Sequence, residues 1–249
     1  IGQKMKMALC EALASSENNF NASEIEAYKY LNNWNGEMSG SSVGTSVFMF
    51  TNYHIMNNLI SPLLNDEYVK LYLNIIDHWD FLRNFLYSRK VPFEHKGSFE
   101  DVVCQGFQLA VSELKEKKGD LAENWQWAAI HQIEFEHPLG KQKPLNVLFN
   151  LGPYGVNGGF NAVNKIMSHQ GDHSYKVSSL PSTRRLINLG ANSKSYSVLP
   201  SGNSGHFQSD HYDDQLALFL KGEYRQLYFT PEQVNDNKVT TFQLIPNKK

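Results

Sequence analysis

The sequence has few cysteines and no long hydrophobic run, and each shortage excludes a class of protein. Cys10 and Cys104 are the two cysteines among 249 residues, too few and too far apart for a disulfide framework or a Cys-based zinc site. A membrane-spanning helix needs about 20 apolar residues, whereas the longest apolar stretch, 47–60, is interrupted by Thr51 and Asn52. We therefore expect neither a disulfide-stapled scaffold nor a chain that crosses a membrane.

An excess of positive charge is also missing. The 23 Lys and Arg residues against 25 Asp and Glu residues give a net charge of −2, and the densest basic group is Lys115, Lys117 and Lys118. Nucleic-acid binding rests mostly on a basic surface, so we expect no nucleic-acid partner. With 41% hydrophobic residues, the chain is long enough to bury a core and to fold as a globular protein.

The start of the sequence carries no targeting signal. It begins with Ile1 instead of Met, and residues 1–13 contain no basic stretch leading into an apolar segment. We therefore expect a piece of a longer chain, with its native start elsewhere.

The spacing of apolar residues divides the chain into a helical half and a strand-rich half. Up to about residue 118 they recur at helical spacing, and Ser98 with Asp101 forms a helix-capping pattern. The predicted helices occupy 5–13, 27–34, 68–86 after an Asn65 cap, and Ser98 to Gly119. Beyond Trp125 the period changes, with predicted strands at 133–135, 183–189, 195–199, 225–229 and 239–245 and short helices at 213–220 and after Thr230. Helices followed by mixed strands indicate an α+β fold without a simple βαβ repeat.

Histidines are the first candidates for chemistry. Six of the nine form three pairs along the sequence: His131 and His137, His169 and His173, and His206 and His211. Asp213 and Asp214 follow the last of them. None has the His-Glu-x-x-His spacing of a helical zinc site. A His/Asp metallohydrolase is therefore a weaker alternative than histidines that serve turns and packing.

Three other motifs do not meet the requirements of known sites. The glycine-rich segment 152–159 lacks both the P-loop ending and the dinucleotide-binding spacing, so we expect its glycines to make turns. In 202–205 the spacing differs by one residue from a nucleophile elbow, which excludes Ser204 as the nucleophile. Cys10 and Cys104 lie on apolar helical faces, where buried inert thiols are expected.

Five blocks occur in an order that is more informative than any one of them. They are Leu-Asn-Asn-Trp-Asn-Gly-Glu-Met at 31–38, Trp-Gln-Trp through His at 125–131, His-Pro-Leu-Gly at 137–140, Phe-Asn-Leu-Gly-Pro-Tyr through Val-Asn at 149–164, and Leu-Pro-Ser-Gly-Asn-Ser-Gly-His through Asp-Asp-Gln at 199–215. In this order they resemble the C-terminal part of the large chain of penicillin acylases. That family of N-terminal-nucleophile (Ntn) hydrolases includes cephalosporin acylases and acyl-homoserine-lactone acylases.

The resemblance implies a fold and an activity. Residues 1–249 would be the C-terminal portion of a catalytic domain with a four-layer αββα sandwich, mainly helical over 1–119 and mixed over 120–249. The implied enzyme is an amidohydrolase that cleaves a linear amide, either the acyl side chain of a β-lactam or an N-acyl homoserine lactone. Its precursor would cut itself to expose a Ser, Thr or Cys nucleophile at a new N-terminus. The alternatives are a truncated binding or scaffold module without catalysis and, less favoured, the metallohydrolase.

The resemblance places no catalytic residue on this chain. Ile1 has no hydroxyl or thiol, so the nucleophile and the oxyanion hole are expected upstream, and the chain alone is expected to be inactive. Arg184, Asn188 and His211 are candidates for supporting the catalytic groups indirectly, although the family usually has an acidic residue where this chain has Asn188. No cofactor and no metal are expected here, because the family's calcium is held largely by the upstream region.

The resemblance also implies partners and a location. The upstream part of the same precursor would be the protein partner, and a small-molecule amide would be the substrate of the complete enzyme. A chain separated from that upstream part would expose apolar surface and a strand edge, so self-association is expected. Bacterial members of the family often work in the periplasm or outside the cell, and we expect the same location for this protein.

Overall fold

Helices occupy most of the first half of the chain, as the spacing of its apolar residues predicts. The computed structural model describes residues 2–74, 78–92, 95–171, 174–190 and 194–246. It forms two compact units, Ile1–Leu180 and Pro181–Lys249, which we call the N-terminal and C-terminal units. Helices and short antiparallel strands both occur, which confirms the predicted α+β class. In the described part of the chain no helix is both long and apolar enough to cross a membrane.

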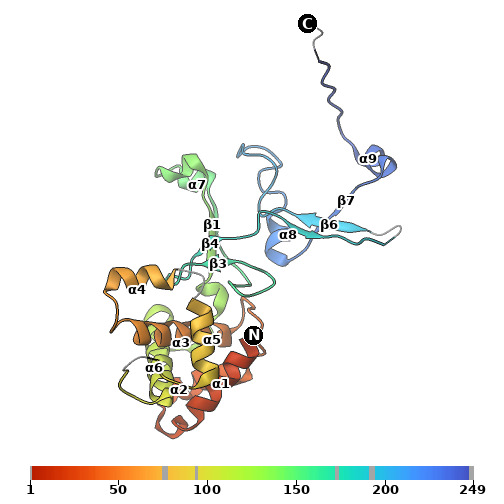
Figure 1. Ribbon diagram of the computed structural model, residues 1–249. Helices are drawn as coiled ribbons and strands as arrows, with labels where there is room; N and C mark the ends of the chain where they lie inside the picture. Colours follow the sequence, from red (N-terminus) through yellow and green to blue (C-terminus); the bar gives the residue numbers. More distant parts are fainter. Residues whose placement is uncertain (1, 75–77, 93–94, 172–173, 191–193, 247–249) are drawn as a thin grey trace. The chain divides into compact units, whose positions relative to one another are not determined.

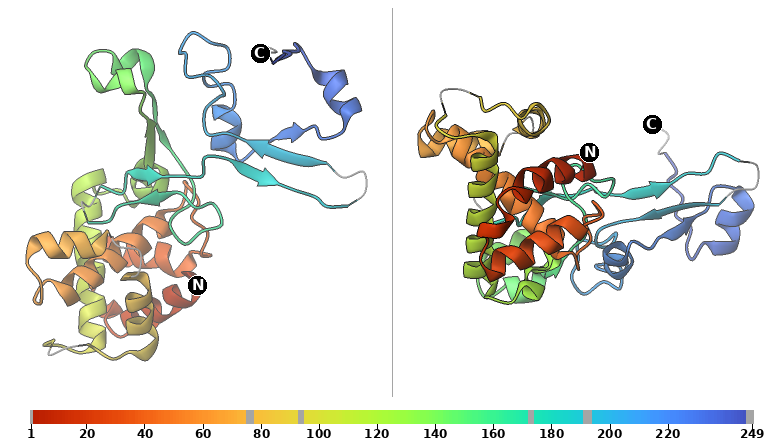
Figure 2. Two further views of the ribbon diagram at one scale, coloured as in Figure 1. Left: turned by 45° about the horizontal axis from the view of Figure 1, so that its top comes forward. Right: turned by 90° about the horizontal axis from the view of Figure 1, so that it is seen from below.

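Six α-helices build the core of the N-terminal unit, and they stay grouped in all views (Figures 1 and 2). Their bounds are α1 Gly2–Ala14, α2 Ala22–Asn33, α3 Val43–Ile60, α4 Asp66–Leu73, α5 His78–Ser88 and α6 Phe99–Lys118. Short 3-10 helices at Glu17–Asn19, Ala122–Trp125 and Trp127–Ala129 join or follow them.

Helix α3 is the central element, and the sequence did not single it out. It is buried on nearly every side, including the polar side chains of Thr51 and Asn52. His54, Asn57 and Asn58 are its partly exposed residues. A helix that is covered on nearly all sides has only a weak amphipathic period. The polar interruptions that argue against a membrane span in 47–60 lie inside this helical core.

Helices α3 and α6 pack closely where Gly106 of α6 meets Ile55 of α3. A Cβ atom at Gly106 would lie 2.6 Å from Ile55 Cγ1 and 3.1 Å from the Ile55 backbone nitrogen. The preceding residue of α3, His54, donates from Nε2 to Glu113 Oε2 of α6 at 2.7 Å. The glycine therefore sets how closely the two helices approach.

We expect Gly106→Ala to lower the free energy of unfolding by about 1 to 3 kcal/mol, because overpacking forces the helices apart. This loss would appear despite the better helix propensity of alanine. Urea denaturation followed by circular dichroism measures it. Ser112→Ala, an exposed position on the same helix, is the control and is expected to change stability by less than about 0.5 kcal/mol. Equal stability of Gly106→Ala and the wild type would contradict the close approach.

The capping signals in this unit are confirmed. Ser98 Oγ accepts from the Asp101 N–H, and an Asp101 carboxylate oxygen accepts from the Ser98 N–H. Gly119 ends α6 at φ 85°, and Asn65 caps α4 by accepting from the Tyr68 N–H.

The single helix predicted over 68–86 is wrong, because the structure has two. Helix α4 ends at Leu73, and α5 begins at His78; residues 75–77, with Ile75 and Ile76 of the predicted apolar face, lie outside the described residues. Asn74 follows α4, and its side-chain oxygen accepts from the Gly171 N–H at 2.9 Å. Asparagine is a poor interior helix residue because its side chain competes for such bonds, so this contact favours an end at Asn74.

Two antiparallel strand pairs complete the N-terminal unit. Strand β1, Gln132–Phe135, confirms the prediction and pairs with β2, Leu151–Gly155. The segment between them carries a 3-10 helix, Pro138–Lys141, and α7, Asn146–Phe149, at the end of an arm visible in Figure 1. Strands β3, Met167–Ser168, and β4, Val177–Ser179, form the second pair. The sequence did not predict β2 to β4, because β2 contains glycine and proline and the other two are very short.

The C-terminal unit has a three-stranded antiparallel sheet in the order β5-β6-β7. Its elements are β5 Arg184–Leu186, β6 Ser195–Val198, α8 Leu216–Lys221, β7 Arg225–Leu227 and α9 Pro231–Asn237. Each lies within or beside a predicted segment, and Thr230 and Gln233 form the expected capping box.

The strand predicted at 239–245 is wrong, because the segment has no regular structure and its apolar side chains are exposed. A strand is stabilised by hydrogen bonds and side-chain pairs with a neighbour. No described strand pairs with this segment, so its alternating pattern alone does not produce one.

Candidate functional site

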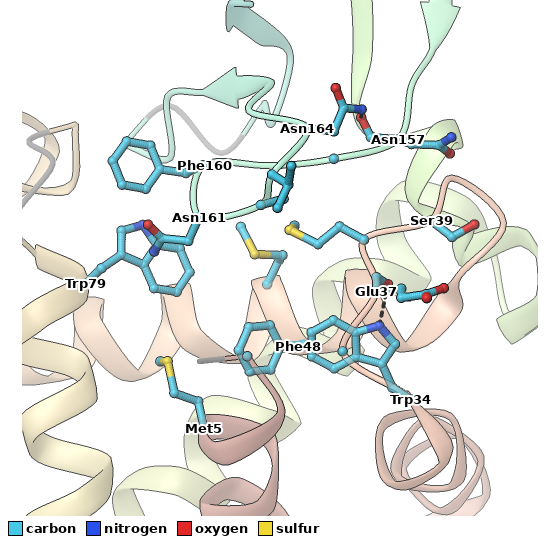
Figure 3. A pocket seen from close by; sticks show the side chains of 17 residues that line it. Met5, Trp34, Glu37, Ser39, Phe48, Trp79, Asn157, Phe160, Asn161 and Asn164 are labelled. Carbon is cyan, nitrogen blue, oxygen red and sulfur yellow. Dashed lines mark hydrogen bonds between the residues drawn. The ribbon is translucent and has the colours of Figure 1, made fainter. Parts of the chain in front are cut away.

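The N-terminal unit contains an open cavity of about 560 Å³. Four aromatic side chains line it: Trp34, Phe48, Trp79 and Phe160 (Figure 3). They come from the end of α2, from α3, from α5 and from the loop after β2. A pocket of this size, mainly apolar with a few polar groups, is typical of a small-molecule site.

The first wall is built by the block 31–38. Trp34 Nε1 donates to the Glu37 carbonyl at 2.7 Å, and the Thr45 hydroxyl donates to the same oxygen at 3.1 Å. The Glu37 N–H donates to the Asn35 side chain at 2.9 Å. Three bonds therefore fix the Glu37 backbone, while the Glu37 side chain is exposed. The Trp34 ring packs on Phe48 with a centroid distance of 4.7 Å.

The second wall is the loop 157–164, which lies far along the chain from the first. The Gly40 N–H donates to Asn157 Oδ1 at 2.6 Å, and the Gly158 N–H donates to the Met38 carbonyl at 2.7 Å. Trp127 Nε1 donates to the Gly158 carbonyl at 2.9 Å. Gly158 has φ 95°, which strongly favours glycine. Gly158 therefore lets the loop turn against the first wall, whereas Gly152 and Gly155, also expected in turns, lie in strand β2.

The lining of the cavity contains little charge. Glu37 is the one charged side chain among the described residues that line it. The other polar side chains of the lining are Ser39, Asn157, Asn161 and Asn164. The lining is therefore mainly apolar, with a few amide and hydroxyl side chains and one acidic residue.

Behind the second wall, His131 is fully buried and stacks on Trp127 with ring centroids 4.6 Å apart. Its Nδ1 donates to the Tyr175 carbonyl at 3.0 Å. Burial lowers the pKa of His131 from 6.5 to about 4, and hydrogen bonds to the backbone of Tyr175 and Ile166 offset part of that effect. His131 is therefore neutral at pH 7 and serves the core.

The other histidines serve separate local structures. His137 Nδ1 accepts from the Leu139 N–H, and its ring stacks on Phe149. His169 and His206 are exposed, and His173 lies outside the described residues. Across the described ranges no group of three or more His, Cys, Asp or Glu side chains is arranged to hold a metal ion, so the structure lends the metallohydrolase alternative no support.

The three candidate support residues lie in the C-terminal unit, and each makes local contacts. Arg184 stacks on the Phe219 ring at 3.7 Å and donates to the Phe219 carbonyl at 2.8 Å. Burial lowers the pKa of Arg184, and the charge of Tyr224 opposes that effect. Asn188 accepts from the Gly190 N–H at 3.0 Å.

His211 Nδ1 donates to Asp214 Oδ2 at 3.1 Å, and Arg225 donates to the same oxygen at 3.2 Å. A role of Arg184, Asn188 or His211 behind the catalytic groups of a complete enzyme stays a prediction.

The block 199–215 forms a loop that is held by hydrogen bonds between its own residues. The buried Gln215 side chain accepts from the Leu199 N–H at 3.1 Å, and the Ser204 N–H donates to the His211 carbonyl at 3.0 Å. A Cβ atom at Gly202 would collide with that same carbonyl. Ser204 Oγ accepts from the His206 N–H, so this serine has a structural contact within the loop.

The cysteines also behave as expected for core residues. Cys10 is buried, and Cys104 is half-buried. Burial raises the pKa of the Cys10 thiol to about 11; the charge of Lys6 opposes this and that of Glu11 adds to it. A protonated thiol is a poor nucleophile.

Sequence reasoning missed the cavity. The blocks 31–38 and 149–164 both contribute to its walls, but their sequences do not predict that they face one another. The available signal was their shared composition, since both combine Asn and Gly turns with an aromatic side chain.

Comparison with known proteins connects these blocks to a family. The penicillin amidase family model matches residues 3–236. The acyl-homoserine lactone acylase QuiP of Pseudomonas fluorescens is 21% identical over the whole chain, and its Pseudomonas aeruginosa counterpart is 22% identical over 54% of the chain. The matches span 31% and 17% of those two relatives.

A solved structure of a penicillin acylase shares the fold of this chain. The thermostable penicillin G acylase from Alcaligenes faecalis superposes with a TM-score of 0.60 at 14% identity, covering 98% of this chain and 46% of the other. The likeness shows a shared fold, and the family model covers nearly every described element. The chain belongs to the penicillin amidase family.

Proposed function

We propose that this chain is the C-terminal part of an amidohydrolase that hydrolyses a linear amide. The match of the family model over residues 3–236 carries the proposal. The two relatives named acyl-homoserine lactone acylases favour an N-acyl homoserine lactone as the substrate over a β-lactam with an acyl side chain. The proposed fold of the complete enzyme is the four-layer αββα sandwich.

In this proposal the upstream polypeptide supplies the nucleophile. A free α-amine has a pKa of about 7.7 to 8.0, so near neutral pH it can accept the proton of its own side-chain hydroxyl. The hydroxyl oxygen attacks the amide carbonyl, and an oxyanion hole holds the tetrahedral intermediate, each donor contributing about 10²-fold to 10³-fold. The amine then leaves with the proton, and water hydrolyses the acyl enzyme. This chain contributes helices, sheet strands and the fixed loops around them.

The test begins with the protein from its native host. Intact mass and N-terminal sequencing are expected to find a longer precursor product and a chain that starts with Ser, Thr or Cys. That material is expected to release homoserine lactone and a free fatty acid from N-acyl homoserine lactones, measured by liquid chromatography with mass spectrometry. Penicillin G in a parallel assay distinguishes the two substrate classes.

The purified 249-residue chain is the matched control and is expected to show no hydrolysis. Activity of this chain that is abolished by one internal substitution would contradict the proposal. If Ile1 is the native terminus and no partner copurifies, the non-catalytic binding module becomes the better description. Detection of the complete protein in a periplasmic or secreted fraction would support the proposed location.

The isolated chain is expected to self-associate, because the C-terminal unit exposes apolar side chains and two sheet edges, β5 and β7. The most exposed apolar residues of this unit are Leu189, Val239, Phe242, Leu244 and Ile245. Such surfaces and unpaired edges promote association. Light scattering should therefore give a mass above the 28.4 kDa of the chain, rising with concentration. A monomer at every concentration would contradict this expectation, and Val239→Lys with Leu244→Lys should reduce the association.

A further inference from the structure

The sequence contains the dipeptide Asn-Gly twice, at Asn35-Gly36 and at Asn157-Gly158, and both glycines line the cavity. Such a pair can react with itself, because glycine has no side chain to keep its backbone nitrogen away from the preceding asparagine side chain. We propose that Asn35 is a site of spontaneous deamidation and that hydrogen bonds in the second wall protect Asn157 from the same reaction.

The reaction needs only water. The Gly36 backbone nitrogen gives up its proton and attacks Cγ of the Asn35 side chain. A bond forms between that nitrogen and Cγ, and the bond from Cγ to Nδ2 breaks, so that Nδ2 takes up one proton and leaves as ammonia. The product is a cyclic imide, which water opens at either carbonyl to give aspartate or isoaspartate.

Several properties are common to the two asparagines and do not distinguish them. Asn35 and Asn157 are both exposed, so water reaches each side chain. Each Oδ1 accepts one backbone N–H. Each backbone carbonyl accepts from a side-chain amide, that of Gln3 for Asn35 and that of Asn164 for Asn157. The two sites therefore form a matched pair within one chain.

The attacking nitrogens differ. The Gly158 N–H donates to the Met38 carbonyl at 2.7 Å, and Gly158 is buried. The Gly36 N–H donates no hydrogen bond within the described part of the chain, and Gly36 is half-buried. A buried donor that loses its partner costs free energy. Gly158 must break its bond before its nitrogen can attack, whereas Gly36 has no such bond to break.

The bonds to the side chains also differ in range. Asn35 Oδ1 accepts from Glu37, two positions along the chain, so this contact moves with the segment that reacts. Asn157 Oδ1 accepts from Gly40 at 2.6 Å, 117 positions away. Rotation of the Asn157 side chain toward its glycine would break a contact between the two walls, and this is a second reason for its protection.

Deamidation at Asn35 would change the first wall of the cavity. The new carboxylate lies close in sequence to the exposed Glu37 side chain, and like charges repel. The isoaspartate form also lengthens the main chain by a carbon atom between Trp34 and Gly36. The bond from Trp34 Nε1 to the Glu37 carbonyl at 2.7 Å, dashed in Figure 3, closes over this segment. We therefore expect that bond to weaken in the deamidated chain.

The test needs no substrate and no catalysis, so its outcome is independent of the proposed hydrolysis. The full chain is incubated in mildly alkaline buffer, and peptide mapping by mass spectrometry follows the mass gained when an amide becomes a carboxyl group. Fragment spectra assign the gain to Asn35 or Asn157. We expect deamidation at Asn35 to be at least about 3-fold faster, the factor that one hydrogen bond accounts for.

Two controls separate the effect of the fold from that of the sequence. In concentrated urea the bonds of the second wall are lost, so the two rates are expected to become similar. Asn35→Gln should remove the fast reaction from the folded chain, because the longer side chain closes the ring less readily. Asn33→Gln, at an exposed asparagine nearby that Trp34 follows, should keep it. Circular dichroism confirms that each variant is folded.

Three results would overturn the proposal. The first is a rate at Asn157 that equals or exceeds the rate at Asn35 in the folded chain. The second is a ratio of the two rates that is the same with and without urea, since the fold would then protect neither site. The third is a folded chain that gains no mass at Asn35 while the unfolded chain does.

Discussion

Replacing Tyr175 by alanine is expected to lower the free energy of unfolding by about 3 to 5 kcal/mol, the range for removing a large aromatic side chain from a core. Tyr175 is fully buried although it lies in a loop region. Its ring stacks on Phe50 of α3 at a centroid distance of 4.6 Å and meets Trp127 edge-on at 5.8 Å. Its hydroxyl donates to the Met49 carbonyl at 3.2 Å.

The backbone of Tyr175 indicates how much this packing contributes. Its φ is 50°, a left-handed conformation that is unfavourable for a bulky residue. The contacts of the ring must outweigh that strain, because they hold the loop in place against the helices. Loss of the ring would remove the packing while the strain remains.

Urea unfolding followed by tryptophan fluorescence measures the effect. Tyr175→Phe keeps the ring and removes only the hydroxyl, so a loss of about 0.5 to 1.5 kcal/mol is expected. Tyr87→Ala, at a half-exposed position, is the matched control and should cost much less. If Tyr175→Ala costs no more than Tyr87→Ala, the ring does not anchor the loop.

Acidification from pH 6.5 to about pH 4 is expected to destabilise the N-terminal unit by about 3 kcal/mol through His131 alone. The pKa of this buried imidazole is about 4, against 6.5 for the unperturbed group. As the pH falls below 6.5 the unfolded chain binds a proton that the folded chain does not, so stability is lost. A shift of this size corresponds to about 1.4 kcal/mol for each pH unit between the two values.

The variant His131→Asn isolates this contribution. Its side-chain amide can still donate toward the Tyr175 carbonyl, but it does not titrate in this range. The variant is expected to be less stable at pH 7 because of lost packing, yet its stability should change less between pH 6.5 and 4. Carboxylates with lowered pKa, such as that of Asp101, whose side chain accepts from Ser98, lose their contribution at lower pH in both proteins.

The comparison uses the pH slope of the unfolding free energy, with exposed His206→Asn as the control. A wild-type slope equal to that of His131→Asn would show that His131 is protonated in the folded chain at the same pH as in the unfolded chain.

The elements that the sequence predicts are those whose signal is local. Ser98, Asp101 and Gly119 mark both ends of α6 within the segment itself, and the caps act through bonds to the first and last turns. The Thr230 capping box is equally local. These features need no knowledge of the rest of the fold.

The elements that the sequence does not predict depend on distant neighbours. Helix α3 has little exposed surface because other segments cover it, and the segment 239–245 lacks a described strand beside it. The two walls of the cavity are joined by the hydrogen bond from the Gly40 N–H to Asn157, and these residues are 117 positions apart. Tyr175 occupies the core from a loop with positive φ, which no periodic pattern indicates. Each of these outcomes is decided by tertiary contacts, which override local preference.

The extensive burial of α3 has a consequence for synthesis on the ribosome. Chains emerge from the N-terminus, so α3 leaves the ribosome before α6 and well before Tyr175, whose hydroxyl bonds to a carbonyl 126 residues earlier. Until those later segments are made, the apolar side chains of this helix lack the neighbours that cover them in the folded unit. Exposed apolar surface in a nascent chain promotes aggregation and chaperone binding. The yield of folded protein is therefore expected to depend on how soon the segments that cover 43–60 are made.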